Sequence, residues 1–98
     1  MKRVEVYYDS YFTEKLKEEL REYGIEQYFI VPIIYSSWSK NFKHFNTHVW
    51  PGTDSMLIAY IEDEQAKEIL RLIKIMKIDL GKGISMGAVM FPIEDIIL

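Results

Sequence analysis

The chain has 98 residues, of which 49% are hydrophobic and none is cysteine, and its formal net charge at pH 7 is -3. This length suits one small domain with a real hydrophobic core, so we expect a single domain over residues 1–98. The negative charge argues against a nucleic-acid-binding protein, because such proteins usually present a strongly positive face. The lack of cysteine excludes disulfides and thiolate metal sites and suits the cytoplasm, and the longest apolar run, "YFIVPIIY", is too short for membrane insertion.

The first quarter of the chain predicts a strand followed by a helix. In residues 2–8 apolar and polar side chains alternate, as in a half-buried strand. In residues 10–24 apolar side chains recur at helical spacing. Asp9 or Ser10 is a suitable N-cap for that helix, and Gly24 is a suitable end.

The two following strands are expected to be apolar on both faces. Residues 25–37 carry apolar side chains on both alternating sets, and so do residues 55–62. Pro32 lies inside the first of these strands and favours a sheet edge or a bulge.

The remainder predicts a helix and a final strand. Residues 63–77 form an amphipathic pattern with Asp63 as a suitable cap, and residues 84–92 form an apolar strand in which Gly87 marks a bulge or a close contact. The expected apolar stripe of the helix consists of Ala66, Ile69, Leu70, Ile73 and Met76.

This order of elements, βαββαβ, predicts an α+β ferredoxin-like fold: a four-stranded antiparallel sheet with two helices on one face. Two helices can cover only one face of the sheet, yet the middle strands present apolar side chains to both faces. The uncovered face therefore needs a partner, and we expect a homo-oligomer.

The long loop at residues 36–55 is the best candidate for a working surface. It has no clear periodicity, and such loops in compact domains are usually functional or disordered. Residues 36–53 include basic side chains but no Asp or Glu, and they also hold four aromatic side chains that could stack on a ligand or fill a partner's pocket. The alternative is that the aromatics fold back on their own domain or only cement an assembly. The candidate ligand-binding residues here are Trp38, Lys40, Lys43 and Trp50.

Two further motifs could carry chemistry. His44 and His48 are four residues apart, a spacing that could bring both rings to one metal ion in a helix, with a third ligand from Asp54, another loop or another subunit. The alternative is solvated or hydrogen-bonded histidines. Gly81 and Lys82, in "LGKGIS", could contact an anion or form a plain turn. The acidic clusters suit helix ends and turns, and no nucleophile motif is present, so we do not expect an enzyme.

The stretches "VWPGTDSMLIAYIEDEQAKEILRLI" and "MFPIEDII", together with the order of elements, resemble the PII signal-transduction superfamily. The resemblance implies a trimeric regulatory protein whose subunit clefts bind a small effector, commonly an adenine nucleotide, and whose long loop engages a target protein. Against the family's phosphate-binding "TGxxGDGK", this chain has "LGKGISMG", which keeps Gly81 and Lys82 but has Ser85 and Gly87 where an acid and a lysine are expected. Nucleotide binding of the usual kind is therefore weakened, and the cofactor stays open.

A second family shares the trimeric plan and a Trp in the corresponding region: the CutA-type metal-tolerance proteins. Resemblance to that family would imply a divalent-metal-binding protein, with His44 and His48 as the metal ligands. The closing motif "MFPIEDIIL" differs from that of the CutA group, which leaves metal binding as the alternative reading.

Overall fold

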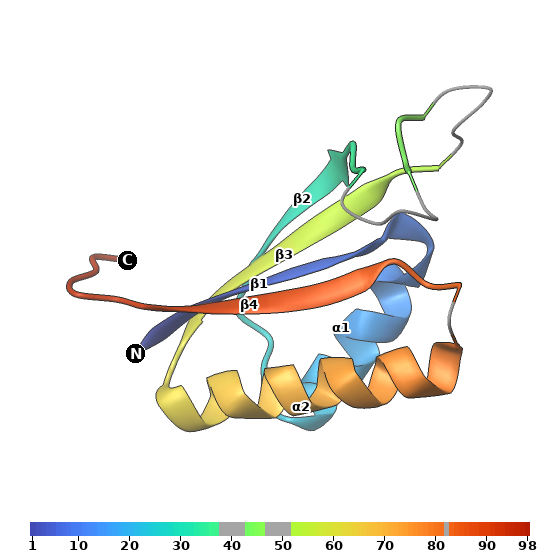
Figure 1. The fold of residues 1–98 in the computed structure, drawn as a ribbon. Coiled ribbons are helices and arrows are strands. Elements are labelled where there is room, and N and C mark those ends of the chain that lie inside the picture. Colours follow the sequence, from blue (N-terminus) through green and yellow to red (C-terminus); the bar gives the residue numbers. More distant parts are fainter. Residues whose placement is uncertain (38–42, 47–51, 82) are drawn as a thin grey trace.

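The computed structural model of the protein describes residues 1–37, 43–46, 52–81 and 83–98. Four strands form one antiparallel sheet in the order β2-β3-β1-β4, and both α-helices cover the same face of that sheet (Figure 1). This arrangement confirms the predicted ferredoxin-like α+β fold. The elements are β1 (Lys2–Asp9), a 3-10 turn (Ser10–Phe12), α1 (Thr13–Glu22), β2 (Phe29–Ile34), β3 (Asp54–Ile61), α2 (Asp63–Leu80) and β4 (Met86–Pro92).

The core lies between the sheet and the two helices. Side chains of β1 alternate between buried and half-buried along the strand, so one side of the strand faces the helices and the other faces away. Residues opposite each other in the β1–β3 register point to the same side, which places Val4 beside Ala59 and Val6 beside Leu57. The buried apolar residues are Val4, Val6, Tyr8, Leu16, Leu20, Ile25, Leu57, Ala59, Ile61, Ala66, Ile69, Leu72, Ile73, Met76 and Met86.

Both ends of the first helical segment follow from local hydrogen bonding. The Asp9 side chain accepts a hydrogen bond from the backbone N–H of Tyr11, so Asp9 caps the 3-10 turn that leads into α1. At the other end Gly24 has φ +73°, and its N–H donates to the carbonyl of Arg21 while Ile25 N–H donates to the carbonyl of Leu20. These two backbone hydrogen bonds end the helix and direct the buried Ile25 side chain into the core.

Pro32 has both of the effects that the sequence predicts. β2 is an edge strand, and its register against β3 shifts between Val31 and Ile34. Proline cannot donate to a neighbouring strand, so an irregular edge accommodates it without an unpaired buried carbonyl. The freed Pro32 carbonyl accepts a hydrogen bond from the Ser55 hydroxyl at 2.6 Å.

Two details of α2 differ from expectation. The N-cap position is Glu62, without a capping side-chain hydrogen bond, and Asp63 instead pairs with the N-terminal amine at 3.1 Å. The amine lies beside the first turn of α2 and competes for the carboxylate. The buried stripe contains Leu72, whereas Leu70 is only half-buried, because the helix rotates slightly relative to the predicted face. In the part of the chain described, neither helix has the length and apolar character required to cross a membrane.

Candidate functional site

The side of the sheet away from the helices, here called the open face, carries a mainly apolar surface. The strand register identifies the residues of this face, because side chains at paired positions of neighbouring strands point to the same side of the sheet. None of them is buried in the single chain. The apolar or aromatic members are Phe29, Val31, Met56, Ile58, Tyr60, Val89 and Phe91, around a row of Arg3, Glu5 and Tyr7 on β1.

Glu5 is the centre of that polar row. Its carboxylate accepts a hydrogen bond from Arg3 Nε at 2.7 Å and another from the Tyr7 hydroxyl. The Tyr7 hydrogen bond is the main reason that the pKa of Glu5 is lowered, and the same bond raises the pKa of Tyr7. The Glu5 side chain therefore stays ionised, and the Tyr7 proton is held towards the carboxylate.

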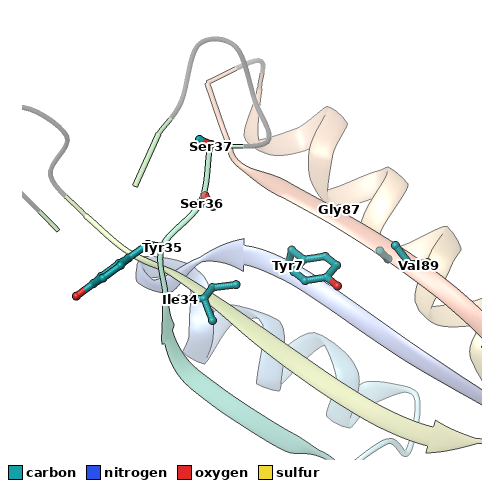
Figure 2. A pocket seen from close by; sticks show the side chains of 8 residues that line it. Tyr7, Ile34, Tyr35, Ser36, Ser37, Gly87 and Val89 are labelled. Atoms are coloured by element: carbon teal, nitrogen blue, oxygen red, sulfur yellow. The ribbon is translucent and has the colours of Figure 1, made fainter. Parts of the chain in front are cut away.

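A hollow of about 620 Å³ lies on the open face at the start of the long loop (Figure 2). It is lined by Tyr7, Ile34, Tyr35, Ser36, Ser37, Gly87, Ala88 and Val89. In Figure 2 the Tyr7 ring lies between Ile34 and Val89, whereas the Tyr35 ring points away from Tyr7. Gly87 is the register partner of Tyr7 and contributes no side chain, and no bulge interrupts the register there. The volume suits a small molecule held between an apolar wall and a few hydroxyl groups.

A cluster of hydrogen-bonded polar side chains attaches the loop to the start of β3; it is called the polar cluster and consists of Asp9, Ser36, His44, Asp54 and Ser85. Asp54 is fully buried at its centre. His44 Nδ1 lies 2.7 Å from one Asp54 carboxylate oxygen, and the hydroxyls of Ser36 and Ser85 donate to the other. The buried carboxylate is thereby fully hydrogen-bonded, as a buried charge requires.

The backbone at the loop base is also paired. Ser36 and His44 exchange two N–H to carbonyl hydrogen bonds of 2.8 Å each, and Asn46 N–H donates to the Gly52 carbonyl at 2.9 Å. The connection between β2 and β3, residues 35–53, is therefore anchored at its middle as well as at its ends. A Cβ atom at Gly52 would lie 3.5 Å from the His44 ring, so the glycine backbone packs closely against the imidazole.

The polar cluster does not have the arrangement of a nucleophile and its base. The Ser36 hydroxyl donates to Asp54 and not to the imidazole, while His44 Nε2 lies 3.8 Å from an Asp9 oxygen. A serine nucleophile needs a base within hydrogen-bond reach of its own proton. Within the described residues, the hydrogen bonds of the cluster join the loop base to the start of β3 and to the segment before β4.

The structure describes three of the predicted binding residues: Lys43, His44 and Gly81. Lys43 is half-buried at the loop base, and Gly81 lies at the C-terminus of α2 with φ +89°. His44 is placed in the polar cluster. The predicted residues Trp38, Lys40, His48, Trp50 and Lys82 lie outside the described residues.

The metal-binding alternative gains no support from the described part of the chain, where no group of three His, Asp or Glu side chains could hold an ion. One nitrogen of His44 is hydrogen-bonded to Asp54, the residue that the sequence offers as a third metal ligand. A site that uses His48 stays a prediction, and calorimetry with zinc and copper on wild type and a His44→Ala, His48→Ala variant would test it.

Sequence reasoning did not identify Ser36, Ser85 and Tyr7 as site residues. Serines carry no periodic signal, and their roles depend on contacts between residues far apart in the chain: Ser85 and Asp54 are 31 positions apart. For Tyr7 a signal does exist, because it follows Arg3 and Glu5 at a spacing of two on one face of a predicted strand.

The Tyr7 to Glu5 hydrogen bond makes stability depend on pH. Because the folded-state pKa of Glu5 is lowered, its contribution is present above the ordinary carboxyl pKa and is lost as the pH falls through the lowered value. We expect Tyr7→Phe to reduce the free energy of unfolding by about 1 kcal/mol at pH 7, and by less at acidic pH. Urea unfolding at both pH values and one protein concentration measures this, with exposed Tyr11→Phe as the control; an equal loss at both pH values would contradict it.

Comparison with known proteins supports the fold. No family model matches the sequence, and a search of curated proteins finds no relative. The structure, however, matches a PII-like signalling protein of Thermus thermophilus with a TM-score of 0.66 and 19% identity, over 92% of this chain and 83% of that chain. This chain has the PII-like fold.

The second PII-like match is CPII, a nitrogen regulatory PII-like protein of Thiomonas intermedia. Its structure bound to ADP, AMP and bicarbonate has a TM-score of 0.67 and 15% identity, over 92% of this chain and 84% of that chain. A structure of CPII bound to ADP and bicarbonate has a TM-score of 0.68 and 14% identity, with the same coverage. The resemblance to PII-like proteins is thus confirmed at the level of the fold.

Proposed function

We propose that this chain is a cytoplasmic, non-enzymatic regulatory protein of the PII-like type. In this proposal it forms a homotrimer, binds a small anionic effector such as an adenine nucleotide at clefts between subunits, and engages a target protein through the 36–55 loop. The observation that carries the proposal is that Ser36 both lines the hollow and donates a hydrogen bond to Asp54 in the polar cluster. A ligand in the hollow would therefore contact a residue that holds the loop base.

This shared residue offers a route for signalling. A ligand changes a conformational equilibrium only if it interacts differently with the alternative states. If an effector bound in the hollow draws the Ser36 hydroxyl away from Asp54, the His44 pair and the two backbone bonds at Ser36 are affected at once. The loop would then be presented to its target in a different shape.

Trimer formation is supported by the open face. Its apolar side chains remain accessible in one chain, with Phe29 57% and Phe91 40% exposed. Covering such a surface removes apolar area from water at about 25 cal/mol per Å². The hollow lies on the same face, so a neighbouring copy would close one side of it.

The anionic effector class is supported by the ligands in the two CPII structures, which are ADP, AMP and bicarbonate. In this chain the cations expected near such a ligand are Lys40 and Lys43 of the loop and Lys82 after α2, with Gly81 beside it. Trp38 and Trp50 could stack on a base. These residues remain the proposed contacts of the effector.

A thermal-shift titration tests the proposed function. We expect one of ATP, ADP, AMP or bicarbonate to stabilise the protein, by about 2.7 kcal/mol at a concentration 100 times its Kd. Ser36→Ala should weaken this stabilisation, whereas Ser10→Ala, which removes a hydroxyl outside the hollow, should not. No stabilisation by any of these anions, or an equal response of both variants, would contradict the proposal.

A further inference from the structure

The polar row on the open face is flanked by apolar side chains on both sides. Arg3, Glu5 and Tyr7 occupy alternate positions of β1, one of the two inner strands of the sheet. Their register partners on β3 and β4 are Tyr60, Ile58, Met56, Phe91, Val89 and Gly87. One row that includes an ion pair thus runs between apolar strands, and Asp9 and Asp54 of the polar cluster lie at its loop end.

The row is organised within the chain. The Glu5 side chain is only 12% exposed and accepts from Arg3 Nε, while Arg3 Nη1 donates to the Tyr60 hydroxyl and the guanidinium lies 5.5 Å from the centre of that ring. Among the described residues no hydrogen bond uses Arg3 Nη2, and each Glu5 oxygen accepts one bond. Both ions therefore keep capacity for a further partner above the sheet.

A second copy of this chain is the occupant that fits this face. Four strands about 4.8 Å apart and six to eight residues long, with a rise of about 3.3 Å per residue, span roughly 450 Å² in projection. With side-chain relief this approaches the accessible area, about 800 Å² per partner, of a stable interface. Away from the polar cluster, Arg3 and Glu5 give the face one positive and one negative charge, so this part of the face is complementary to itself.

We propose that Arg3 and Glu5 determine the register in which copies of this chain pack through their open faces, with Arg3 of each copy meeting Glu5 of the next. This rests on the proposed oligomer. The backbone positions of Arg3 and Glu5 are about 7 Å apart along β1, so a slip by one side-chain position places residues of like charge opposite each other. Like charges in contact inside an interface reject that arrangement. The apolar residues drive association, and the ion pairs select one geometry.

A charge swap tests this directly. The variant Arg3→Glu, Glu5→Arg keeps an opposite pair in each chain and should assemble with itself. It should not mix with wild type, because each mixed contact places Arg on Arg or Glu on Glu. We expect native mass spectrometry of the swap variant with nitrogen-15-labelled wild type to show mixed oligomers reduced at least about tenfold below random mixing. Lys67→Glu, on α2, is the control and should mix freely.

The outcomes separate this inference from the proposed function. Random mixing of the swap variant with wild type, or failure of a folded swap variant to assemble, would overturn the inference. If wild type is still a trimer in that case, the proposed function stands. A monomeric wild type would overturn the oligomer and the inference together. If circular dichroism shows that the swap variant is unfolded, Glu5→Gln decides: a roughly tenfold weaker assembly supports the inference, and unchanged assembly overturns it.

Discussion

Replacing Asp54 by alanine should lower the free energy of unfolding by about 3 to 5 kcal/mol, the largest effect that we expect of any polar substitution. The carboxylate is fully buried and accepts from Ser36 and Ser85 while it pairs with His44. Its removal leaves these three groups without their partner in a space that is largely closed to water. Urea denaturation at pH 7 measures the change.

Two further variants sharpen the test of Asp54. Asp54→Asn keeps the shape but removes the charge and one acceptor, so its loss should be smaller, about 1.5 to 3 kcal/mol. Asp79→Ala removes an exposed carboxylate of α2 and should change stability by less than about 0.5 kcal/mol. If Asp54→Ala were no more destabilising than Asp79→Ala, the polar cluster would not be an anchor of the loop.

The second large effect concerns assembly. Ile58 lies in the middle of the open face, opposite Phe29 on one side and Glu5 on the other. Ile58→Lys should leave the single chain folded, because the side chain is only half-buried, but an interface would bury one additional positive charge from each copy. At a cost of about 3 kcal/mol or more per contact, association should weaken by at least about 100-fold.

Light scattering over a series of protein concentrations measures this change. The matched control is Ile78→Lys, which places the same charge on α2, where the isoleucine is 79% exposed. We expect wild type and Ile78→Lys to have the same oligomeric mass and Ile58→Lys to be monomeric at micromolar concentration. An unchanged mass for Ile58→Lys would show that copies do not meet through the open face.

The sequence predicts most of the fold because its patterns have unambiguous periods. Alternation over residues 2–8, the glycine at position 24 and the proline at position 32 each restrict the backbone locally, and the structure agrees with all three. The predicted N-cap of α2, Asp63, was wrong, and the Asp63 side chain pairs instead with the N-terminal amine, a contact across 62 positions that no local pattern contains.

The site is less predictable because it depends on tertiary contacts. His44 was recognised as a residue of interest, but whether an imidazole binds a metal or a carboxylate depends on what the fold places beside it, and here that is Asp54. Ser85 reaches the same carboxylate from the segment before β4. The hollow likewise combines residues of β1, of the end of β2 and of β4, which no sequence window contains together.

The two backbone hydrogen bonds between Ser36 and His44 divide the connection between β2 and β3 into two smaller loops. Closing a chain costs entropy that grows only slowly with length, so residues added between 36 and 44, or between 46 and 52, would each be tolerated without disturbing the other closure. The two halves can therefore change in length and sequence independently during evolution.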